Sequence, residues 1–189
     1  MICMDAFTQA FKLMTLGYSV IPVRLVPDSD KQGRSSKVPM VQWKRYQTMP
    51  ADEDTLIDWQ REYEQTHWGV VTGAVSGCLV LDADTDEAKS LLKTQLGQPH
   101  VITPRGGAHW YVARAGFART ATGIIPGVDV RGDGGFATIL GPGYEVRSMP
   151  TQDTLVAFDT LPEELRIGVT GHKRSIVVDD VIPEGQRND

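Results

Sequence analysis

The spacing of apolar side chains predicts several helices. Phe7 and Phe11 lie one helical turn apart behind Asp5, a residue type that caps helices, so residues 5–16 are predicted to form a helix that Gly17 ends. The same spacing predicts three further helices, at residues 52–65, 85–96 and 161–166.

Short apolar runs rich in β-branched residues predict strands, and one such run covers residues 18–26. Residues 27–40 are instead rich in Pro, Ser, Gly and Lys, so we predict a polar loop there. Because strands dominate the second half of the chain, the pattern predicts an α+β fold with an antiparallel sheet. The other predicted strands are 68–72, 77–83, 99–103, 108–114, 127–131, 135–140, 144–147 and 174–178.

The composition is that of an ordinary globular protein. With 189 residues, of which 41% are hydrophobic and 23% charged, the chain suits one domain or two small lobes that share a cleft. No apolar run approaches the ~20 residues that a membrane span requires, and no signal-peptide pattern is present. Cys3 and Cys78 are too few for a disulfide framework or a cysteine-rich zinc site. We therefore expect a cytoplasmic protein.

The net charge of −5 disfavours nucleic-acid binding, but the distribution of the charges does not. Acids concentrate in residues 51–64 and in the last 39 residues, whereas residues 93–147 carry six basic side chains against three acidic ones. A local basic patch binds a polyanion whatever the total charge, although a solvated surface of mixed charge explains the same pattern equally well. Residues 31–45 carry no acid and five basic side chains, Lys31, Arg34, Lys37, Lys44 and Arg45.

Two acids, Asp82 and Asp84, follow the buried-strand pattern Leu79-Val80-Leu81. Alternate residues of a strand share a face, so the two carboxylates converge, with Cα atoms about 7 Å apart. Two anions this close repel unless a cation lies between them, which favours a site for Mg²⁺ or Mn²⁺. Alternatively, Asp84 caps the next helix in a capping box and Asp82 lies at a wet strand end. For an isolated Asp-x-Asp pair, this structural explanation is the commoner one.

Two later segments carry polar groups that suit a phosphate or a metal ion. Arg105 precedes two glycines, which let backbone approach a ligand closely, and His109 begins the strand that follows. Asp129 stands between Val128 and Val130 on a short predicted strand, so its carboxylate points away from the apolar side. Each feature alone is weak, because a single His or Asp is more often structural.

Taken together, these segments resemble the primase-polymerase domain of the archaeo-eukaryotic primase superfamily. That superfamily has an Asp-x-Asp or Asp-x-Glu strand, then a small-x-His strand, then a hydrophobic-Asp strand, in the order found here. At residues 140–144 the chain departs from the Pro-Pro-Ser segment of many relatives, so nucleobase and sugar contacts are not carried over. The matching segments are 81–84, 107–109 and 128–130, with further similarity at 17–23, 37–39, 69–73, 103–107 and 129–135. The resemblance spans about residues 10–147.

The resemblance implies a fold and a set of roles. The fold is α+β and archaeo-eukaryotic primase-like, with antiparallel or mixed sheets, an RRM-like catalytic half, and flanking helices around a central cleft. Asp82, Asp84 and Asp129 would bind two Mg²⁺ or Mn²⁺ ions, and His109 would contact the phosphates of the incoming nucleotide. We call these four residues the predicted catalytic set. Further nucleotide contacts are implied at Arg105, Gly106 and Arg131.

The implied activity is template-directed nucleotidyl transfer by a two-metal mechanism, as in a DNA primase and DNA polymerase of phage or plasmid replication. The substrates would be a DNA template or primer and dNTPs or rNTPs. Residues 1–178 would form the catalytic domain, and residues 179–189 a linker towards a following region, often a helicase. Trp43 would belong to the core or stack on a base. Candidates for contacts to DNA phosphates are Lys37, Lys44 and Arg45.

Two alternatives use the same acids. A metal-dependent nuclease usually adds a Lys near its carboxylates, but Lys89 lies on the following predicted helix and is expected to face solvent. A non-catalytic primase-like domain would only bind DNA, but three retained acids disfavour a decayed site. A replication-origin nickase needs a His-hydrophobic-His pair, and His67, His100 and His109 each lack such a partner, so this class is set aside.

Overall fold

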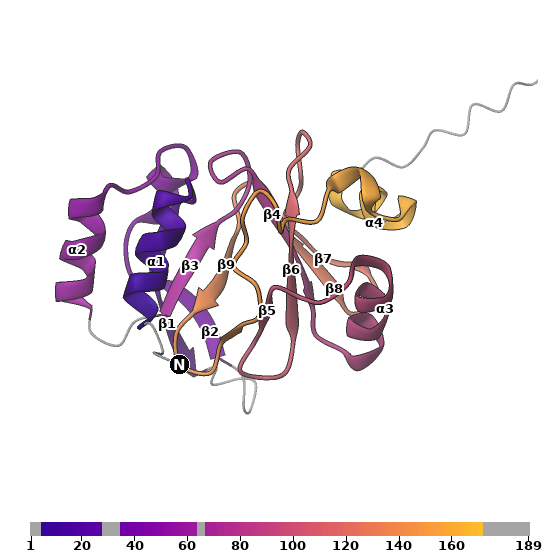
Figure 1. Ribbon diagram of the computed structural model, residues 1–189, viewed down its shortest axis with the longest axis horizontal. Coiled ribbons are helices and arrows are strands. Elements are labelled where there is room, and N and C mark those ends of the chain that lie inside the picture. Colours follow the sequence, from indigo (N-terminus) through magenta and orange to yellow (C-terminus); the bar gives the residue numbers. More distant parts are fainter. Residues whose placement is uncertain (1–4, 28–34, 64–66, 172–189) are drawn as a thin grey trace, which may run out of the picture.

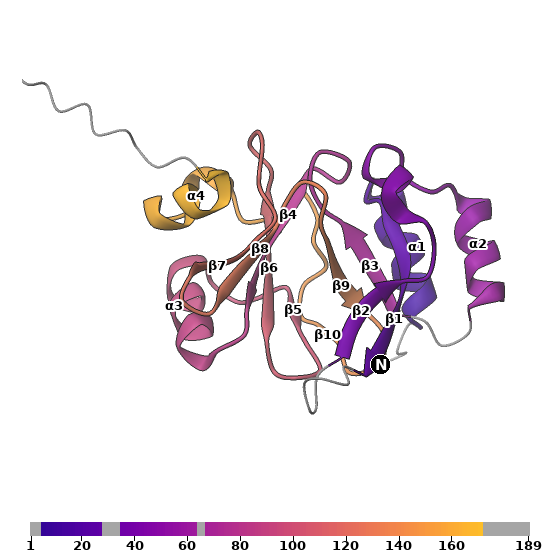
Figure 2. The ribbon, with the colours of Figure 1, turned by 180° about the vertical axis from the view of Figure 1, so that it is seen from behind.

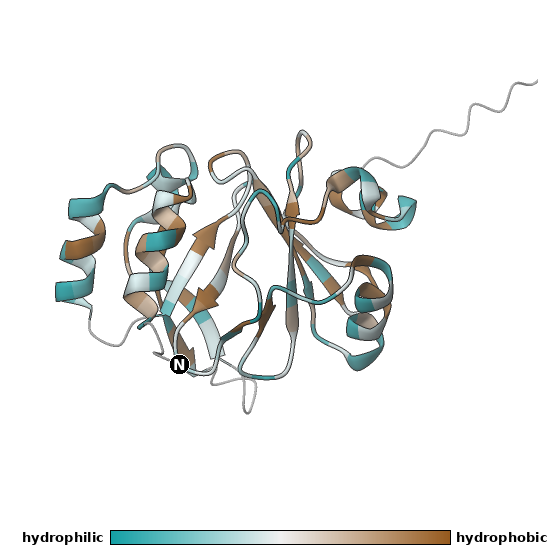
Figure 3. Ribbon diagram, viewed as in Figure 1, coloured by the Kyte–Doolittle hydropathy of each residue, from teal (hydrophilic) through white to brown (hydrophobic). Residues whose placement is uncertain are grey.

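The computed structural model describes residues 5–27, 35–63 and 67–171. Within them, two sheets stand side by side in the middle of the molecule, with a pair of helices on the outer side of each (Figure 1; Figure 2 shows the opposite side). Hydrophobic residues concentrate on the central strands, whereas hydrophilic residues are frequent on the helices (Figure 3). The two sheets therefore face each other, and the helices cover their outer faces.

The first sheet has four strands in the order β2-β1-β3-β9, and all its ladders are antiparallel. Both of its helices begin at an Asp whose carboxylate accepts a backbone N–H of the first turn, Asp5 from Thr8 at 2.8 Å and Asp52 from Thr55 at 3.0 Å. The elements of this half are α1 (Ala6–Thr15), β1 (Val20–Pro27), β2 (Ser35–Pro39), η1 (Trp43–Gln47), α2 (Glu53–Glu62), β3 (His67–Val71) and β9 (Phe136–Leu140).

The second sheet has six strands in the order β10-β5-β6-β4-β8-β7, with β4 in the middle and all six of its residues buried. Helices α3 and α4 cover its outer face. The elements of this half are β4 (Cys78–Ala83), α3 (Asp86–Leu96), β5 (Val101–Ile102), β6 (Ala108–Ala113), β7 (Ala121–Ile125), β8 (Val128–Arg131), β10 (Glu145–Val146), η2 (Phe158–Thr160) and α4 (Glu163–Thr170).

The side chains of β4 alternate between two hydrophobic cores. Leu79 and Leu81 belong to the core behind the six-stranded sheet, where α3 and α4 pack. Cys78 and Val80 point the other way, into the core between the two sheets. Because the alternation continues along the strand, Asp82 faces the four-stranded sheet.

The predicted α+β class and antiparallel sheets are confirmed. The four predicted helices correspond to α1, α2, α3 and α4. Every ladder between the named strands is antiparallel, and within the described residues the parallel pairing is confined to an isolated bridge between Val112 and Val156. None of the helices in the described part of the chain is both long and apolar enough to span a membrane.

Two strands were missed, and both lie at sheet edges. The predicted loop 27–40 contains β2, whose sequence Ser-Ser-Lys-Val-Pro has no apolar alternation because the strand pairs with β1 on one side only. The second missed strand is β7, which includes Gly123 and is partly exposed. The predicted strand 174–178 lies outside the described residues.

Candidate active site

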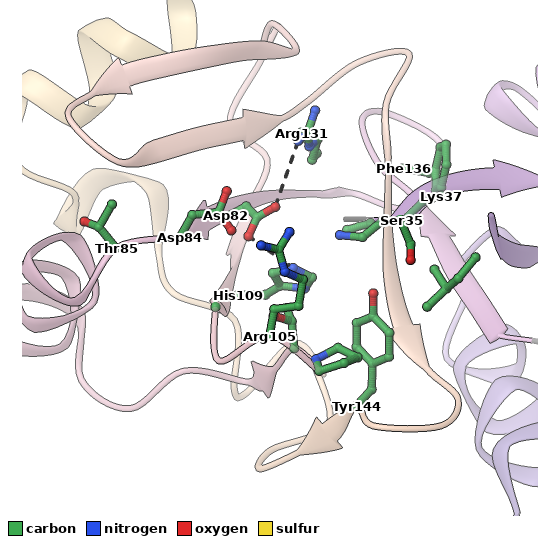
Figure 4. Close-up of a pocket in the computed structure, with 15 residues that line it drawn as sticks. Ser35, Lys37, Asp82, Asp84, Thr85, Arg105, His109, Arg131, Phe136 and Tyr144 are labelled. Carbon is green, nitrogen blue, oxygen red and sulfur yellow. Dashed lines mark ion pairs between the residues drawn. The ribbon is translucent and has the colours of Figure 1, made fainter. Parts of the chain in front are cut away.

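A cavity of about 710 Å³ lies between the inner faces of the two sheets (Figure 4). The four-stranded sheet contributes Leu25, Ser35, Lys37, Phe136 and Ala137 to its lining. The strands β4, β6 and β8 and the residues next to them contribute Asp82, Asp84, Thr85, His109 and Arg131. The loop before β6 and the segment before β10 complete the lining with Thr103, Pro104, Arg105, Gly107 and Tyr144.

Three polar residues form one row across the inner face of the six-stranded sheet. Asp82 on β4 is paired with His109 on β6 and with Asp129 on β8. Directly opposed residues of an antiparallel ladder point to the same face, with Cβ atoms about 4.5–5.5 Å apart. Asp84 follows Asp82 by two residues and extends this face beyond the end of β4. The strand register thus gathers the whole predicted catalytic set on one face of the sheet.

Asp82 is a buried carboxylate, with an exposed fraction of 6%. Its Oδ1 lies 3.3 Å from Nε2 of His109, but the pair lacks hydrogen-bond geometry, so neither atom has a hydrogen-bond partner within the described residues. Burial acts to raise the pKa of Asp82, but His109, Lys37 and Arg131 together hold that pKa well below its usual range. The folded protein therefore contains an ionised, buried carboxylate that can accept a ligand.

The rings of His100 and His109 are held in different ways. Nδ1 of His100 accepts the Tyr111 N–H at 3.1 Å, and its Nε2 lies 2.8 Å from the Thr154 carbonyl oxygen, so both ring nitrogens are bonded. His109 is also buried, yet neither of its ring nitrogens has a hydrogen-bond partner in the described part of the chain. Its Nε2 instead lies 3.3 Å from the Asp82 carboxylate, and His109 lines the cavity, so its ring belongs to the charged cluster and can contact a ligand there.

Asp84 is exposed and lines the cavity next to Asp82. Its pKa is raised, first by partial burial and then by the negative charges of Asp82 and Asp129. The alternative role of Asp84 as a helix cap is wrong, because Thr85 is the N-cap of α3 and its Oγ1 accepts the Ala88 N–H at 3.2 Å. Asp84 is therefore an anion crowded by two other anions.

Asp129 is held by two donors. Its Oδ1 accepts the Gly123 N–H at 2.9 Å, and its Oδ2 accepts a hydrogen bond from Nη2 of Arg131 at 3.1 Å. The same Nη2 lies 3.9 Å from Oδ2 of Asp82, the ion pair drawn as a dashed line in Figure 4. Arg131 thus contacts both carboxylates, and it lines the cavity whereas Asp129 does not.

These carboxylates fit divalent cations in their chemistry. Carboxylate oxygens are ligands that Mg²⁺ and Mn²⁺ prefer, and Asp82 has a buried oxygen without a partner in the described residues. After burial, the charges of Asp82 and Asp129 raise the pKa of Asp84, and a bound cation offsets the effect of those charges. Among residues 5–27, 35–63 and 67–171, however, no group of three or more His, Cys, Asp or Glu side chains is spaced to hold a metal ion. Asp129, the third carboxylate, is paired with Arg131 instead.

The loop between β5 and β6 brings Arg105 to the cavity. Gly106 in this loop has a φ of +79°, and its carbonyl accepts a hydrogen bond from Nζ of Lys89 at 2.7 Å. Lys89 also pairs with Asp86 at 2.7 Å. Lys89 was expected to face solvent, and its side chain is partly exposed, at 27%. Lys89 connects α3 to the Arg105 loop, which is not the role that the nuclease hypothesis requires of a lysine.

Of the predicted DNA contacts, Lys37 lines the cavity and contributes to the lowered pKa of Asp82. Lys44 and Arg45 lie in η1 and are not part of the lining. Arg45 donates a hydrogen bond to the Tyr46 hydroxyl, and its guanidinium carbon lies 4.6 Å from the centroid of that ring. Two further residues of the basic segment, Lys31 and Arg34, lie outside the described residues.

Sequence reasoning missed most of the wall that the four-stranded sheet supplies. Phe136 packs edge-on against Trp43, with ring centroids 5.3 Å apart, which places Trp43 against the core between the sheets. The hydroxyl of Tyr144 points into the cavity (Figure 4), and burial raises the pKa of Tyr144 to about 12. The sequence contained one indication that Tyr144 lines the site: it follows the segment in which this chain departs from its relatives. The other missed lining residues are Leu25, Ser35, Thr85, Thr103, Pro104 and Ala137.

The site combines clustered carboxylates with a histidine, arginines and a lysine. This combination is typical of sites that bind phosphorylated ligands in enzymes that transfer phosphoryl or nucleotidyl groups. The sequence matches the family described as bifunctional DNA primase/polymerase, N-terminal, over residues 10–179. Because this match covers most of the 189 residues, the chain belongs to that family. The family implies nucleotidyl transfer, with DNA and nucleotides as substrates and a general dependence on metal ions. The search of curated proteins found no match.

Proposed function

We propose that this chain catalyses template-directed nucleotidyl transfer, as a DNA primase and DNA polymerase. One observation carries the proposal: Asp82, His109 and Asp129 form a single row across one sheet, and Asp82, His109 and the neighbouring Asp84 line a cavity of about 710 Å³. The opposite wall supplies Lys37, so positive and negative groups face one space. This arrangement suits a triphosphate together with the cations that accompany it.

In this mechanism Asp82, Asp84 and Asp129 would hold two Mg²⁺ or Mn²⁺ ions. The chemistry that such ions supply is activation of a 3′-hydroxyl and stabilisation of the leaving pyrophosphate. His109 would contact the phosphates of the incoming nucleotide from within the sheet.

Two further residues of the cavity, Arg105 and Arg131, would orient the same nucleotide, together with the backbone at Gly106 next to the lining. Arg105, on the loop that Lys89 supports, would bind phosphate oxygens from the opposite side, and the Gly106 backbone would allow their close approach. Arg131 would add a second guanidinium. These side chains would position the triphosphate and neutralise its charge, and positioning of this kind accounts for much of the rate in phosphoryl transfer.

The partners follow from the same assignment. A DNA template or primer would contact Lys37, Lys44 and Arg45, and dNTPs or rNTPs would enter the cavity. The six-stranded sheet would be the RRM-like catalytic half, and residues 1–178 the whole domain with its cleft. Residues 179–189 would lead to a helicase region in a phage or plasmid replication protein of the cytoplasm.

Primer extension on a DNA template with dNTPs and Mg²⁺ or Mn²⁺ tests the proposal. The protein should lengthen the primer, and Asp82→Ala should reduce the rate about 100-fold or more, because it removes a carboxylate at the centre of the row. Asp58→Ala is the matched control, since Asp58 is an exposed carboxylate on α2 with only a surface ion pair to Arg61. Shortening of the primer would favour the nuclease alternative. DNA binding without turnover under either metal would favour the non-catalytic alternative.

A further inference from the structure

Arg131 lies where a cation is needed between two anions. Its Nη2 is 3.1 Å from Oδ2 of Asp129 and 3.9 Å from Oδ2 of Asp82, and the two aspartates face each other across the β4–β8 ladder. Without a positive charge nearby, two carboxylates on directly opposed residues of neighbouring strands repel strongly in a partly buried site. In the protein without bound metal, the guanidinium of Arg131 therefore offsets this repulsion.

Asp129 has one hydrogen bond that is independent of Arg131. Oδ1 of Asp129 accepts the Gly123 N–H at 2.9 Å, and this bond does not involve the guanidinium. The backbone of Asp82 is held in the centre of β4, between β6 and β8, and does not depend on Arg131. The guanidinium therefore acts on the two carboxylates mainly through its charge.

Arg131 also has a place to go. Its side chain is 32% exposed and lines the cavity, in contrast to the 8% exposure of the Asp82 side chain. On the sheet Arg131 is paired with Val80, one row beyond Asp82, so the guanidinium reaches the acids along the sheet surface. A rotation of its side chain turns it into the cavity with no change in strand register.

We propose that Arg131 is an internal counter-ion, which stabilises the Asp82–Asp129 pair before divalent cations bind and is displaced from it when they do. This inference rests on the proposed function, because it assumes that these carboxylates bind the cations. The displaced guanidinium then faces the cavity, where the triphosphate would lie. Arg131 thereby couples two events: when the cations bind, its guanidinium is released towards the phosphates.

The test is a Mn²⁺ titration of the full chain without nucleotide, in which free Mn²⁺ is measured by electron paramagnetic resonance. Arg131→Gln removes the competing cation, so Mn²⁺ should bind about three- to tenfold more tightly than in the wild type. Arg131→Lys keeps the charge and should stay within about twofold of the wild type. The matched control is Arg147→Gln, which removes an exposed arginine from an ion pair with Glu145 outside the cavity and should leave the affinity unchanged.

Asp82→Asn separates the two proposals. If this substitution leaves Mn²⁺ binding unaffected, the cations do not bind at these acids, and the metal site of the proposed function fails together with the counter-ion. If it weakens binding at least about tenfold while Arg131→Gln leaves the affinity unchanged or lower, the metal site stands and the counter-ion role alone is refuted.

Thermal unfolding gives a second measurement that does not depend on activity. Arg131→Gln should be less stable than the wild type without metal, and saturating Mg²⁺ should remove most of that difference, because the cation replaces the lost charge. A stability difference that is the same with and without Mg²⁺ would mean that Arg131 only supports the local structure, and it would overturn the inference.

Discussion

Asp133 connects three segments of the chain, and its replacement should destabilise the whole fold. Its carboxylate accepts the Ala74 N–H at 3.1 Å, from the turn after β3, and the Ala118 N–H at 2.8 Å, from the segment before β7. Nη2 of Arg114 donates a third hydrogen bond at 3.2 Å. The fit is also tight, because a Cβ added at Gly73 would lie 2.7 Å from Oδ1 of Asp133.

The magnitude follows from these contacts. Asp133→Asn keeps the shape of the side chain but places an NH₂ group against a donor and removes the charge that pairs with Arg114. A hydrogen bond to a charged group contributes about 1.5–3 kcal/mol, and the 23% exposure of the Asp133 side chain reduces what the ion pair adds. The free energy of unfolding should therefore fall by about 2–4 kcal/mol at pH 7.

The pH dependence tests the cause. Burial acts to raise the pKa of Asp133, but the bonds from Ala118, Arg114 and Ala74 outweigh burial and lower that pKa. A lowered pKa in the folded state means that the stabilisation is fully present above the unfolded value of about 3.9. It is lost as the pH falls through the lower folded pKa.

Denaturant unfolding of wild type and Asp133→Asn at pH 7, 5 and 3.5 measures this effect. The stability difference should be equal at the two higher pH values and smaller at the lowest. Asp58→Asn, at an exposed ion pair, should change stability by less than about 0.5 kcal/mol. An Asp133→Asn variant as stable as this control, or a difference that does not decrease at low pH, would refute the reasoning.

Three more substitutions probe the cavity itself. His109→Ala should lower kcat/KM for the nucleotide about 100-fold and leave primer-template affinity within about twofold, and an equal loss of DNA affinity would mean a different role for His109. Gly107→Ala places a Cβ 3.2 Å from Oδ1 of Asp84 and 3.0 Å from Oγ1 of Thr103, so kcat should fall about tenfold with a stability loss of about 1 kcal/mol, measured by primer extension and denaturant unfolding. Lys89→Met removes the bond to the Gly106 carbonyl, so KM for the nucleotide should rise about three- to tenfold in steady-state assays.

The clearest success of the sequence was the face shared by Asp82 and Asp84. The prediction needed only the two-residue period of a strand, which is a local property. It could not show that Asp82 is opposite His109 and Asp129, because register between distant strands depends on the turns and packing between them. The three segments were expected to lie together because their order matches the motifs of the superfamily that the chain resembles. No rule about their spacing in the sequence predicted it.

What the sequence could not show is the opposite wall of the cavity. Ser35 and Lys37 lie on β2, an edge strand whose polar composition is typical of a loop. Their approach to the acids exists only because two separate sheets pack face to face. Sequence reasoning predicted a DNA contact for Lys37 and did not show that this lysine lies within electrostatic range of Asp82.

Asp84 had two possible roles in the sequence, as the cap of the following helix or as part of the site. Thr85 and Asp84 are both residue types that cap helices, and the sequence alone does not decide between them. In the structure Thr85 takes the Ala88 N–H, which leaves Asp84 with a raised pKa and the charges of Asp82 and Asp129 beside it. Negative charges beside an ionised carboxylate disfavour its charged form, and a bound cation offsets that repulsion. Lys37 and His109 offset part of this repulsion at Asp84, as Arg131 does at Asp82 and Asp129, so the protein supplies some of the compensation that a bound cation would complete.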